Sequence, residues 1–477
     1  MMCFLISPKC KLKTEYRSIV PPAPHIADCE DLEAMYEQFD ERNLFGERPK
    51  WPFWKGHLQW HSSWNENNDI ENEELLLGNN ERLIMGPYPP WIEGADEDNL
   101  PMTRRVQRDL WIHQHPKDNC KSHTTRFFLV DWRQEENFGI GAQLNFMIGA
   151  FSLAVQDNRI FIMKNFNRAN HSGCIGENRS EWSCYFHLET SSECRARALE
   201  LESSDSAWQW GYLANTSTKD PTWIDEWIAP SPNNWGDPWL YMQPTKDIKQ
   251  KLFVHHNESS RVWWRAQAIR YLMRFPTQYM CSLMNKARHE AFGIVAAKLV
   301  VQTLPYNWPK ENTNLENGGL ETFVWTPAKP WIPRPILSLH VRIGDKGKEM
   351  RLYPFKVYME LAKRVRKRFP HVSQVWLSSE MQNVIESSKH YNHNWTFFYT
   401  KVQRQRGRTS MKDYEKSLGQ KASTNNAFVN LLMAADADFF VGALGSTWCT
   451  IIDGLRSTNG KIMAGYLSVN EDRTWKW

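Results

Sequence analysis

The chain has 477 residues, of which 41% are hydrophobic and 23% are charged. This length favours two or three domains over a single core, and a mean hydropathy of -0.60 excludes disordered, collagen-like and integral-membrane proteins. The 58 Lys and Arg exceed the 54 Asp and Glu by only +4. The chain therefore lacks the basic excess of a dedicated nucleic-acid binder.

The sequence gives two indications of the cellular compartment. No run of about 18 apolar residues is present, and the N-terminus is too polar for a signal-peptide core, so we expect no transmembrane segment in this chain. Asn-x-Ser/Thr sequons favour the secretory lumen, and they occur at Asn170, Asn178, Asn215, Asn257 and Asn394. Four cysteines without a CxxC pattern favour disulfides over zinc, with buried thiols as the alternative. These four are Cys120, Cys174, Cys184 and Cys194.

The first part of the chain divides near residue 100, where the composition and the hydrophobic period of the sequence change. Residues 1–100 are rich in Pro and Trp without a sustained hydrophobic period, which predicts an irregular region with one short helix. A β-α-β unit follows, with strands over 126–132 and 159–165 and an apolar helix over 143–156. We expect residues 101–330 to form an α/β domain.

Glycines follow the first of these strands, at the end where open α/β sheets bind ligands. The pair Gly139 and Gly141 lacks the third spaced glycine of the dinucleotide fingerprint, so we do not expect NAD. Further along, residues 261–275 predict an amphipathic helix, and Pro and Gly punctuate a connector that ends near 330.

Residues 331–477 alternate between strands and helices. Strands are expected over 335–341, 374–379, 396–400, 438–443 and 461–465, and helices over 354–369, after Ser379, over 427–437 and over 449–457. This alternation predicts a doubly wound parallel sheet. Ligands of such a sheet lie at the loops that leave the strand ends.

Two of these loops carry chemistry suited to a diphosphate. Residues 340–349 contain Arg342, whose planar fork matches two oxygens, and Lys346, a point charge. Residues 442–447 run into a helix whose N–H groups and dipole favour an anion. The structural alternative is a salt bridge between Arg342 and Asp345 together with a Gly-Ser helix cap.

At these loops the sequence resembles the alpha-1,6-fucosyltransferase-like family, with the related nodulation enzymes and, distantly, the protein O-fucosyltransferases. HVRIGDK, with Glu349 close behind, resembles the donor-binding motif. Four further segments resemble the family in the right order over about 115–467: NFGIGAQLN, EWSCYFHLETSSEC, RVWWRAQAIRYLMR and NNAFVNLLMAADADFFVGALGSTWC. The resemblance implies two Rossmann-like domains facing a cleft, in the GT-B-like manner, and a Golgi or secretory location.

The resemblance also implies an inverting, metal-independent transfer of fucose from GDP-fucose to a glycan or glycoprotein acceptor, with no cofactor. It places Arg342 on the diphosphate and His340 on the nucleotide, and it makes Glu349 the base. Asp345 and Lys346 complete the catalytic set. The implied donor-binding residues of the other segments are Gly139, Gly141, Gln143, Asn430, Ser446 and Thr447.

The chain departs from the family at three positions. The family carries Arg where Ile343 stands, Asp where Asn430 stands and Ser where Gly445 stands, and the spacing from Lys346 to Glu349 is one residue shorter. We also expect these 477 residues to contain none of the family's N-terminal anchor, coiled coil and C-terminal SH3-like domain. Donor chemistry therefore transfers better than acceptor identity.

Three other functions compete with transfer to a glycan. A protein O-fucosyltransferase uses the same donor on Ser or Thr. A non-catalytic relative holds the nucleotide sugar or glycan, which the residues Ile343 and Asn430 favour. A nucleic-acid or phosphoprotein binder would use the basic runs 363–368 and 401–408, but helical phasing places the first run on a solvated face.

Overall fold

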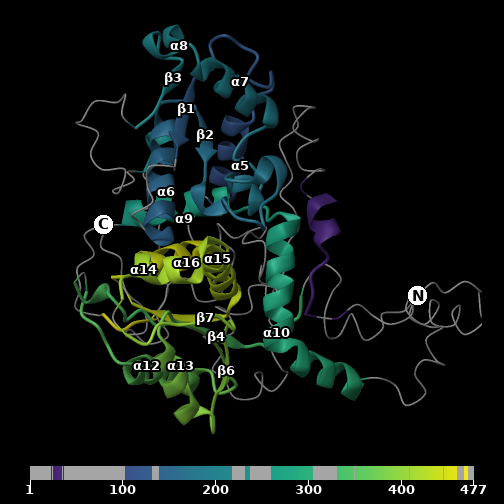
Figure 1. Ribbon diagram of the computed structural model, residues 1–477, viewed down its shortest axis with the longest axis vertical. Coiled ribbons are helices and arrows are strands. Elements are labelled where there is room, and N and C mark those ends of the chain that lie inside the picture. The colour runs from purple at the N-terminus through teal and green to yellow at the C-terminus, as the bar shows by residue number, and fades with distance from the viewer. Residues whose placement is uncertain are drawn as a thin grey trace, which may run out of the picture.

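The computed structural model describes residues 23, 25–34, 36, 103–131, 139–216, 231–236, 259–303, 330–348, 350–407, 409–443, 445–458 and 467–470. Within these residues the strands form two parallel sheets, one of three strands and one of five. A layer of helices lies between the two sheets (Figure 1). The mixed α/β architecture with parallel sheets confirms the predicted fold class.

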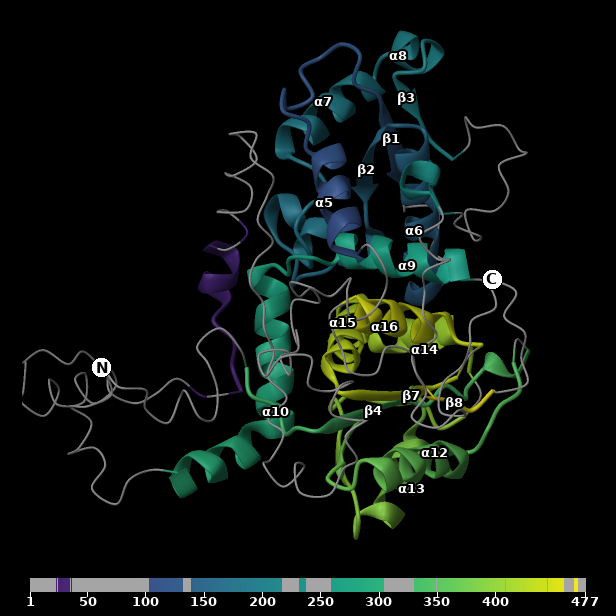
Figure 2. The same ribbon diagram turned by 180° about the vertical axis from the view of Figure 1, so that it is seen from behind.

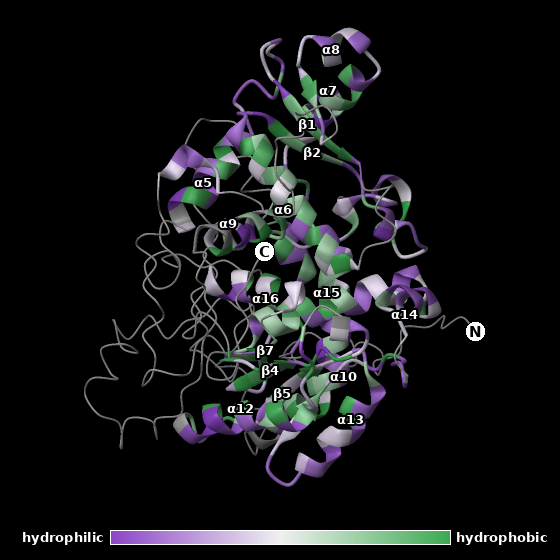
Figure 3. Ribbon diagram, turned by 90° about the vertical axis from the view of Figure 1, so that its left-hand side faces the viewer, coloured by the Kyte–Doolittle hydropathy of each residue, from purple (hydrophilic) through white to green (hydrophobic). Residues whose placement is uncertain are grey.

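The three-stranded sheet contains the predicted β-α-β unit. Strand β1 (Phe127–Asp131) leads through α6 (Ile140–Gln156) to β2 (Ile160–Asn165), and the sheet order is β2-β1-β3 with β3 at Leu213–Ala214. Helix α6 is buried on most sides, as its sequence predicts, and is largely hydrophobic in Figure 3. The other helices of this half are α5 (Thr103–Gln114), α7 (Ser192–Glu202), α8 (Asp205–Gln209) and the short turns η3 (Asn167–Ala169), η4 (Gly176–Asn178), η5 (Trp182–Cys184) and η6 (Asn233–Trp235).

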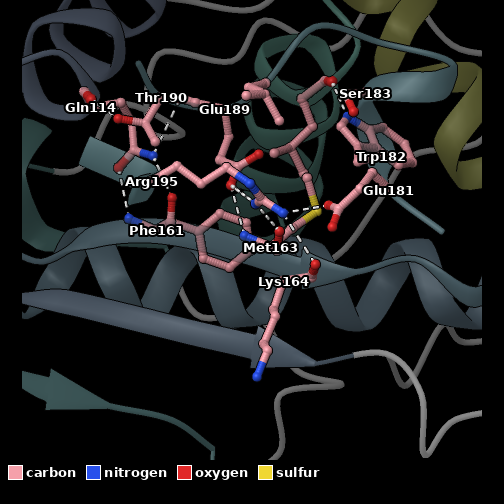
Figure 4. Close-up of polar contacts among 12 residues, drawn as sticks. Gln114, Phe161, Met163, Lys164, Glu181, Trp182, Ser183, Glu189, Thr190 and Arg195 are labelled. Atoms are coloured by element: carbon pink, nitrogen blue, oxygen red, sulfur yellow. Dashed lines mark hydrogen bonds and ion pairs between the residues drawn. The ribbon is translucent and has the colours of Figure 1, made fainter. Parts of the chain in front are cut away.

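At the carboxyl end of β2, one arginine faces two carboxylates (Figure 4). Arg195 of α7 donates hydrogen bonds to Glu181 and to the carbonyls of Met163 and Lys164. Glu189 accepts from the Met163 N–H at 2.6 Å and lies 4.0 Å from Arg195. Burial raises the pKa of Glu181 to about 7. Arg195 lowers this pKa, but it does not offset the burial, and it also serves the second carboxylate, Glu189.

This cluster makes folding stability depend on pH. The folded-state pKa of Glu181, about 7, lies above its ordinary value of 4.5, so its contribution to stability is present below 4.5 and is lost as the pH rises to 7. The variant Glu181→Gln has no ionisable group at this position, so it does not lose this stability as the pH rises. We expect the melting temperature of Glu181→Gln, relative to that of the wild type, to rise between about pH 5 and about pH 8 in thermal unfolding.

The exposed residue Glu177 provides a matched control. The melting temperature of Glu177→Gln is measured over the same pH range. A difference between Glu181→Gln and the wild type that stays constant with pH, or that Glu177→Gln reproduces, would show that Glu181 does not carry the dependence. The charges of Glu189 and Asp131 raise the pKa of Glu181 in the same direction as burial.

Helix α9 (Ser259–Leu272) departs from its prediction. The sequence predicts an amphipathic helix, but its described side chains are buried on every side, including those of Arg265 and Arg270. The reason is its position: α9 packs on α5 and α6 on one side and on α16 on the other. Its amphipathic prediction was therefore wrong, because two halves of the molecule share this helix as core.

The five-stranded sheet confirms the alternation predicted for the second half. Its order is β6-β5-β4-β7-β8, and every pairing is parallel. The strands are β4 (Ile336–His340), β5 (Gln374–Ser378), β6 (Thr396–Phe398), β7 (Phe439–Gly442) and β8 (Leu467–Ser468). The last strand was expected at 461–465, which lies outside the described residues.

Helices cover both faces of this sheet (Figures 1 and 2). One face carries α12 and α13, and the other carries α14, α15 and α16, which separate it from the three-stranded sheet. The sheet is thus doubly wound. The helices are α12 (Phe355–Arg368), α13 (Gln382–Ser388), α14 (Met411–Leu418), α15 (Gln420–Asp436) and α16 (Thr447–Ser457), with short turns η9 (Lys346–Lys348) and η10 (Lys389–Tyr391).

The two basic runs have different fates. On α12, Lys363 and Lys367 are exposed while Leu361 and Val365 are buried, as the helical phasing predicts. In the second run Arg404 is buried, and its guanidinium donates to the carbonyls of Ser379 and Thr400. Part of the second run therefore stabilises the loops at the ends of β5 and β6 and is not a solvated face.

Three disulfides among the described residues confirm the preference for disulfides over zinc. Cys120 bonds to Cys194 and Cys174 bonds to Cys184. A third bond, Cys29–Cys281, attaches the helical residues 29–34 to α10 (Gln278–Thr303). The sequence did not predict this pairing, because 252 residues separate its two cysteines.

The predictions for the remaining features can be compared briefly. No helix among the described residues is long and apolar enough to cross a membrane. Asn170, Asn178 and Asn394 are exposed, Asn215 is half-buried and Asn257 lies outside the described residues. Most of the Trp/Pro-rich region 1–100 also lies outside them. The predicted domain boundaries at 100 and 330 stay predictions.

Candidate functional site

The centre of the five-stranded sheet is a topological switch point. Strands β4 and β7 are parallel neighbours, with Leu339 opposite Val441, and the chain continues from β4 towards β5 on one side and from β7 towards β8 on the other. Open α/β sheets bind ligands at the carboxyl ends of such a strand pair. The two loops that the sequence selects leave from this place, so strand order brings them together.

Arg342 stands in the first of these loops and lies between two carboxylates. One terminal nitrogen donates to Glu380 Oε1 at 2.6 Å, and the other donates to Asp345 Oδ1 at 2.5 Å. Burial favours the neutral guanidine, but the charges of Glu380 and Asp345 raise the pKa of Arg342, so it stays a cation. A guanidinium has more N–H donors than these two bonds use, and Arg342 can therefore still contact an anion.

The salt-bridge alternative raised by the sequence is thus half observed. Asp345 does pair with Arg342, and its second oxygen accepts from the Met411 N–H at 2.8 Å. The charge of Arg342 lowers the pKa of Asp345 even though burial opposes this. Asp345 is therefore an ionised group that orients Arg342 and the start of α14, and a carboxylate held in this way is a poor proton acceptor.

Gly344 is required by this arrangement. A Cβ atom at this position would lie 2.7 Å from Glu380 Oε1, 2.9 Å from the Arg342 guanidinium and 3.2 Å from Gln405 Nε2. Any larger residue would displace the ion pair. Its neighbour Ile343 packs against the hydrophobic core of this half.

His340 ends β4 as a buried neutral imidazole. Its Nδ1 lies 2.9 Å from the Ser378 hydroxyl, and its Nε2 has no hydrogen-bond partner among the described residues. Burial, followed by the positive charge of Arg342, lowers the pKa of His340 to about 3. This nitrogen is therefore a buried polar atom at the switch point that a ligand could satisfy.

Asn430 presents a second unpaired acceptor near the end of β6. Its amide nitrogen donates to the Asn426 carbonyl at 2.8 Å and lies 3.4 Å from the Thr400 hydroxyl. Its Oδ1 is buried and has no partner within the described part of the chain. A carbonyl oxygen in this state is suited to accept a hydrogen bond from a ligand N–H.

The second loop ends in the N-terminus of α16. Ser446 is the N-cap residue, and its side chain makes no cap hydrogen bond, so the other half of the structural alternative is not observed. Thr447 is half-buried at the first helical position. Nearby, burial raises the pKa of the Cys449 thiol to about 12 although the Ala443 N–H and the Ser446 side chain lower it, so this thiol is not reactive.

The glycine turn of the other half reaches this helix. A Cβ atom on Gly141 would lie 3.2 Å from a ring carbon of Trp448 on α16, whereas Gly139 has open space around it. The predicted glycine turn is shorter than expected, because Gly141 lies in the first turn of α6, and it is therefore α6 that contacts α16 here. Gln143 is buried, and its side-chain oxygen accepts a 2.5 Å hydrogen bond from Arg168.

The structure thus gathers His340, Arg342, Asp345, Ser446 and Gly141 around the ends of β4 and β7. Lys346 begins η9 in the same loop, and Glu349 lies outside the described residues. The functional assignments of these residues stay predictions.

Sequence reasoning missed two contributors to the site. Glu380 follows β5 and binds Arg342, and its oxygen also accepts from the Ile343 N–H at 3.1 Å. An acidic residue directly after a strand next to β4 was the available signal. The other is α14, which places the Met411 N–H on Asp345 and lies where the sequence analysis expected no helix.

Comparison with known proteins gives a distant structural likeness. No family model matches the chain, and no curated protein does. The chain is similar to the NodZ alpha-1,6-fucosyltransferase co-crystallized with GDP, at 13% identity and a TM-score of 0.33, over 70% of this chain and 91% of that one. It is also similar to Arabidopsis thaliana FUT1 in complex with GDP, at 12% identity and a TM-score of 0.30, over 76% of this chain and 75% of that one. Likeness at this level carries no inference about activity.

Proposed function

We propose that the chain is an inverting, metal-independent glycosyltransferase that moves fucose from GDP-fucose to a hydroxyl of a glycan. The observation that carries the proposal is the group of unsatisfied or cationic atoms at the switch point: His340 Nε2, the Arg342 guanidinium and the N-terminus of α16. A nucleoside diphosphate matches them, since it offers a polar base and an anion together.

Each part of the donor has a partner in this proposal. The diphosphate binds Arg342, Lys346 and the N–H groups at the start of α16, while Ser446 and Thr447 supply hydroxyls. His340 contacts the nucleoside. The base donates an N–H to Asn430 Oδ1, which is buried and unpaired among the described residues. A single amide oxygen in place of a carboxylate gives a weaker contact with guanine.

In the reaction, the bond between the fucose C1 and the diphosphate oxygen breaks, and a bond from the acceptor oxygen to C1 forms on the opposite face. GDP leaves with the bonding electron pair, and the acceptor proton passes to a carboxylate. We assign this base to Glu349, as the resemblance to the fucosyltransferase family implies. Asp345 and Glu380 are bonded to Arg342 and are therefore not assigned this role. Arg342, Lys346 and the helix N-terminus stabilise the departing charge without a metal.

The test is transfer by the full chain. Purified protein is incubated with GDP-fucose, EDTA and a mixture of N-glycans, other oligosaccharides and Ser/Thr peptides, and products are read by mass spectrometry. We expect one deoxyhexose on a glycan with EDTA present, and no product from Glu349→Gln. No transfer together with no measurable affinity for GDP would refute the proposal.

Two other outcomes would select the competing functions. A deoxyhexose on a peptide alone would identify a protein O-fucosyltransferase. The chain would be a non-catalytic binder if it binds GDP but neither transfers fucose nor hydrolyses the donor. In that case Glu349→Gln should bind GDP as the wild type does. The residues Ile343 and Asn430 are the observation that favours the binder.

A further inference from the structure

Arg168 joins two parts of the molecule that are far apart in sequence. It lies in η3, and its Nε donates to Gln143 Oε1 of α6 at 2.5 Å. A terminal nitrogen donates to Glu415 Oε2 of α14 at 2.9 Å. The side chains of Arg168 and Glu415 are only 10% and 15% exposed. One buried guanidinium therefore links the helix of the glycine turn to a helix of the five-stranded half.

Helix α14 carries a second contact that leads to the candidate site. Its first N–H, from Met411, donates to Asp345, and Asp345 in turn accepts from Arg342. Glu415 follows Met411 by about one helical turn. A short helix thus stands between Arg342 and Arg168, held by a carboxylate at its start and by an arginine one turn later.

The contact around Arg168 is a docking point rather than an isolated surface pair. The side chain of Gln420, the first residue of α15, donates to the carbonyl of Asn167 beside Arg168. Tyr185, in the same disulfide-closed region, donates to Asn425 Oδ1 of α15 at 2.7 Å. Breaking a buried ion pair leaves one charge buried without a partner. Substituting Arg168 or Glu415 should therefore disturb the structure more than breaking an exposed ion pair does.

We propose that Arg168 is a positioning residue of the candidate site. It holds the glycine turn and α14 in one arrangement, and α14 holds Asp345 and thereby the direction of the Arg342 guanidinium. Arg168 itself does not touch the donor. The inference rests on the proposed function, because it takes the diphosphate to lie between the glycine turn and Arg342.

The experiment measures GDP affinity by calorimetry on the full chain. We expect Arg168→Gln and Glu415→Gln each to weaken GDP binding by about tenfold, and the double variant to be no weaker than either single one, because the two residues act as a pair. Arg168→Lys, which keeps the charge facing Glu415, should recover most of the affinity. The exposed pair Arg197–Glu200 supplies the control: its side chains are 38% and 70% exposed, and Glu200→Gln should bind GDP as wild type does.

Two results would overturn the inference while leaving the proposed function intact. In one, folded single variants bind GDP as tightly as wild type. In the other, Arg168→Gln weakens binding and Glu415→Gln does not, which would mean that Arg168 contacts the ligand directly. Wild-type protein without GDP affinity would instead refute the proposed function.

A second readout does not depend on a ligand. The Met411 N–H should exchange its hydrogen faster in Arg168→Gln and Glu415→Gln than in wild type or Glu200→Gln, since α14 loses its ion pair with Arg168. Unchanged exchange at Met411 would remove the link from Arg168 to Asp345, and with it the positioning role.

Discussion

Arg342→Gln should lower the affinity for GDP by about 100-fold in calorimetry. The substitution removes the cation that the proposed function pairs with the diphosphate, and charge-assisted hydrogen bonds of this kind contribute about 1.5–3 kcal/mol each. Arg342→Lys keeps the charge but loses the planar fork, so we expect an intermediate loss. Both variants should bind GDP more weakly than the wild type, while the structure at the N-terminus of α16 should change little.

This expectation needs protection against a loss of folding. Glu380 is buried and relies on Arg342, so removing Arg342 alone leaves an uncompensated carboxylate, at a cost of about 3–5 kcal/mol. The double variant Arg342→Gln/Glu380→Gln removes both charges and should fold better than the single variant. We expect it to bind GDP as weakly as Arg342→Gln.

Lys363→Gln is the matched control for charge. It removes one cation from the exposed face of α12, and GDP affinity should not change. If folded Arg342→Gln kept wild-type affinity, Arg342 would serve only the ion pair with Glu380 and Asp345. If Lys363→Gln had as large an effect, binding would depend on general positive charge rather than on the switch point.

The local sequence predicted most of the secondary structure, because the hydrophobic period of a helix or strand is visible within its own residues. Strand β1, helix α6 and the strands β4 to β7 all lie where the sequence places them. Helix α9 was misjudged because its burial depends on α16, nearly 200 residues later. Helix α14 was missed although Met411, Tyr414 and Leu418 follow helical spacing, because it has only eight residues and therefore repeats that spacing over little more than two turns.

The candidate site was predicted in part for the same reason. Arg342 and Asp345 are three residues apart, so their pairing could be anticipated from the sequence. Glu380 reaches Arg342 only because β4 and β5 are neighbours, and Glu415 reaches Arg168 across 247 residues. Strand order and the docking of the two halves decide such contacts, and neither is encoded by local spacing.

Below the site, at the amino ends of β4 and β7, Asp438 holds together several segments. Its carboxylate accepts from Arg334 and from the Ile336 N–H at 2.8 Å, and its carbonyl accepts from Arg456 at 2.8 Å. Burial alone would lower the pKa of Arg334, but the charges of Asp438 and Asp436 raise it. Asp438 is thus the charge partner of an almost completely buried arginine.

Asp438→Asn should therefore lower the free energy of unfolding by about 3–5 kcal/mol, because it leaves the Arg334 cation without one of its two carboxylates and turns an amide N–H towards a donor. Denaturant unfolding followed by fluorescence measures the change. Glu200→Gln, in the exposed pair with Arg197, should change it by less than about 0.5 kcal/mol. GDP affinity of the folded fraction should stay at the wild-type value, since Asp438 lies at the opposite end of β7 from Ser446. A loss of affinity without a loss of stability would mean that the amino end of the sheet is coupled to the site.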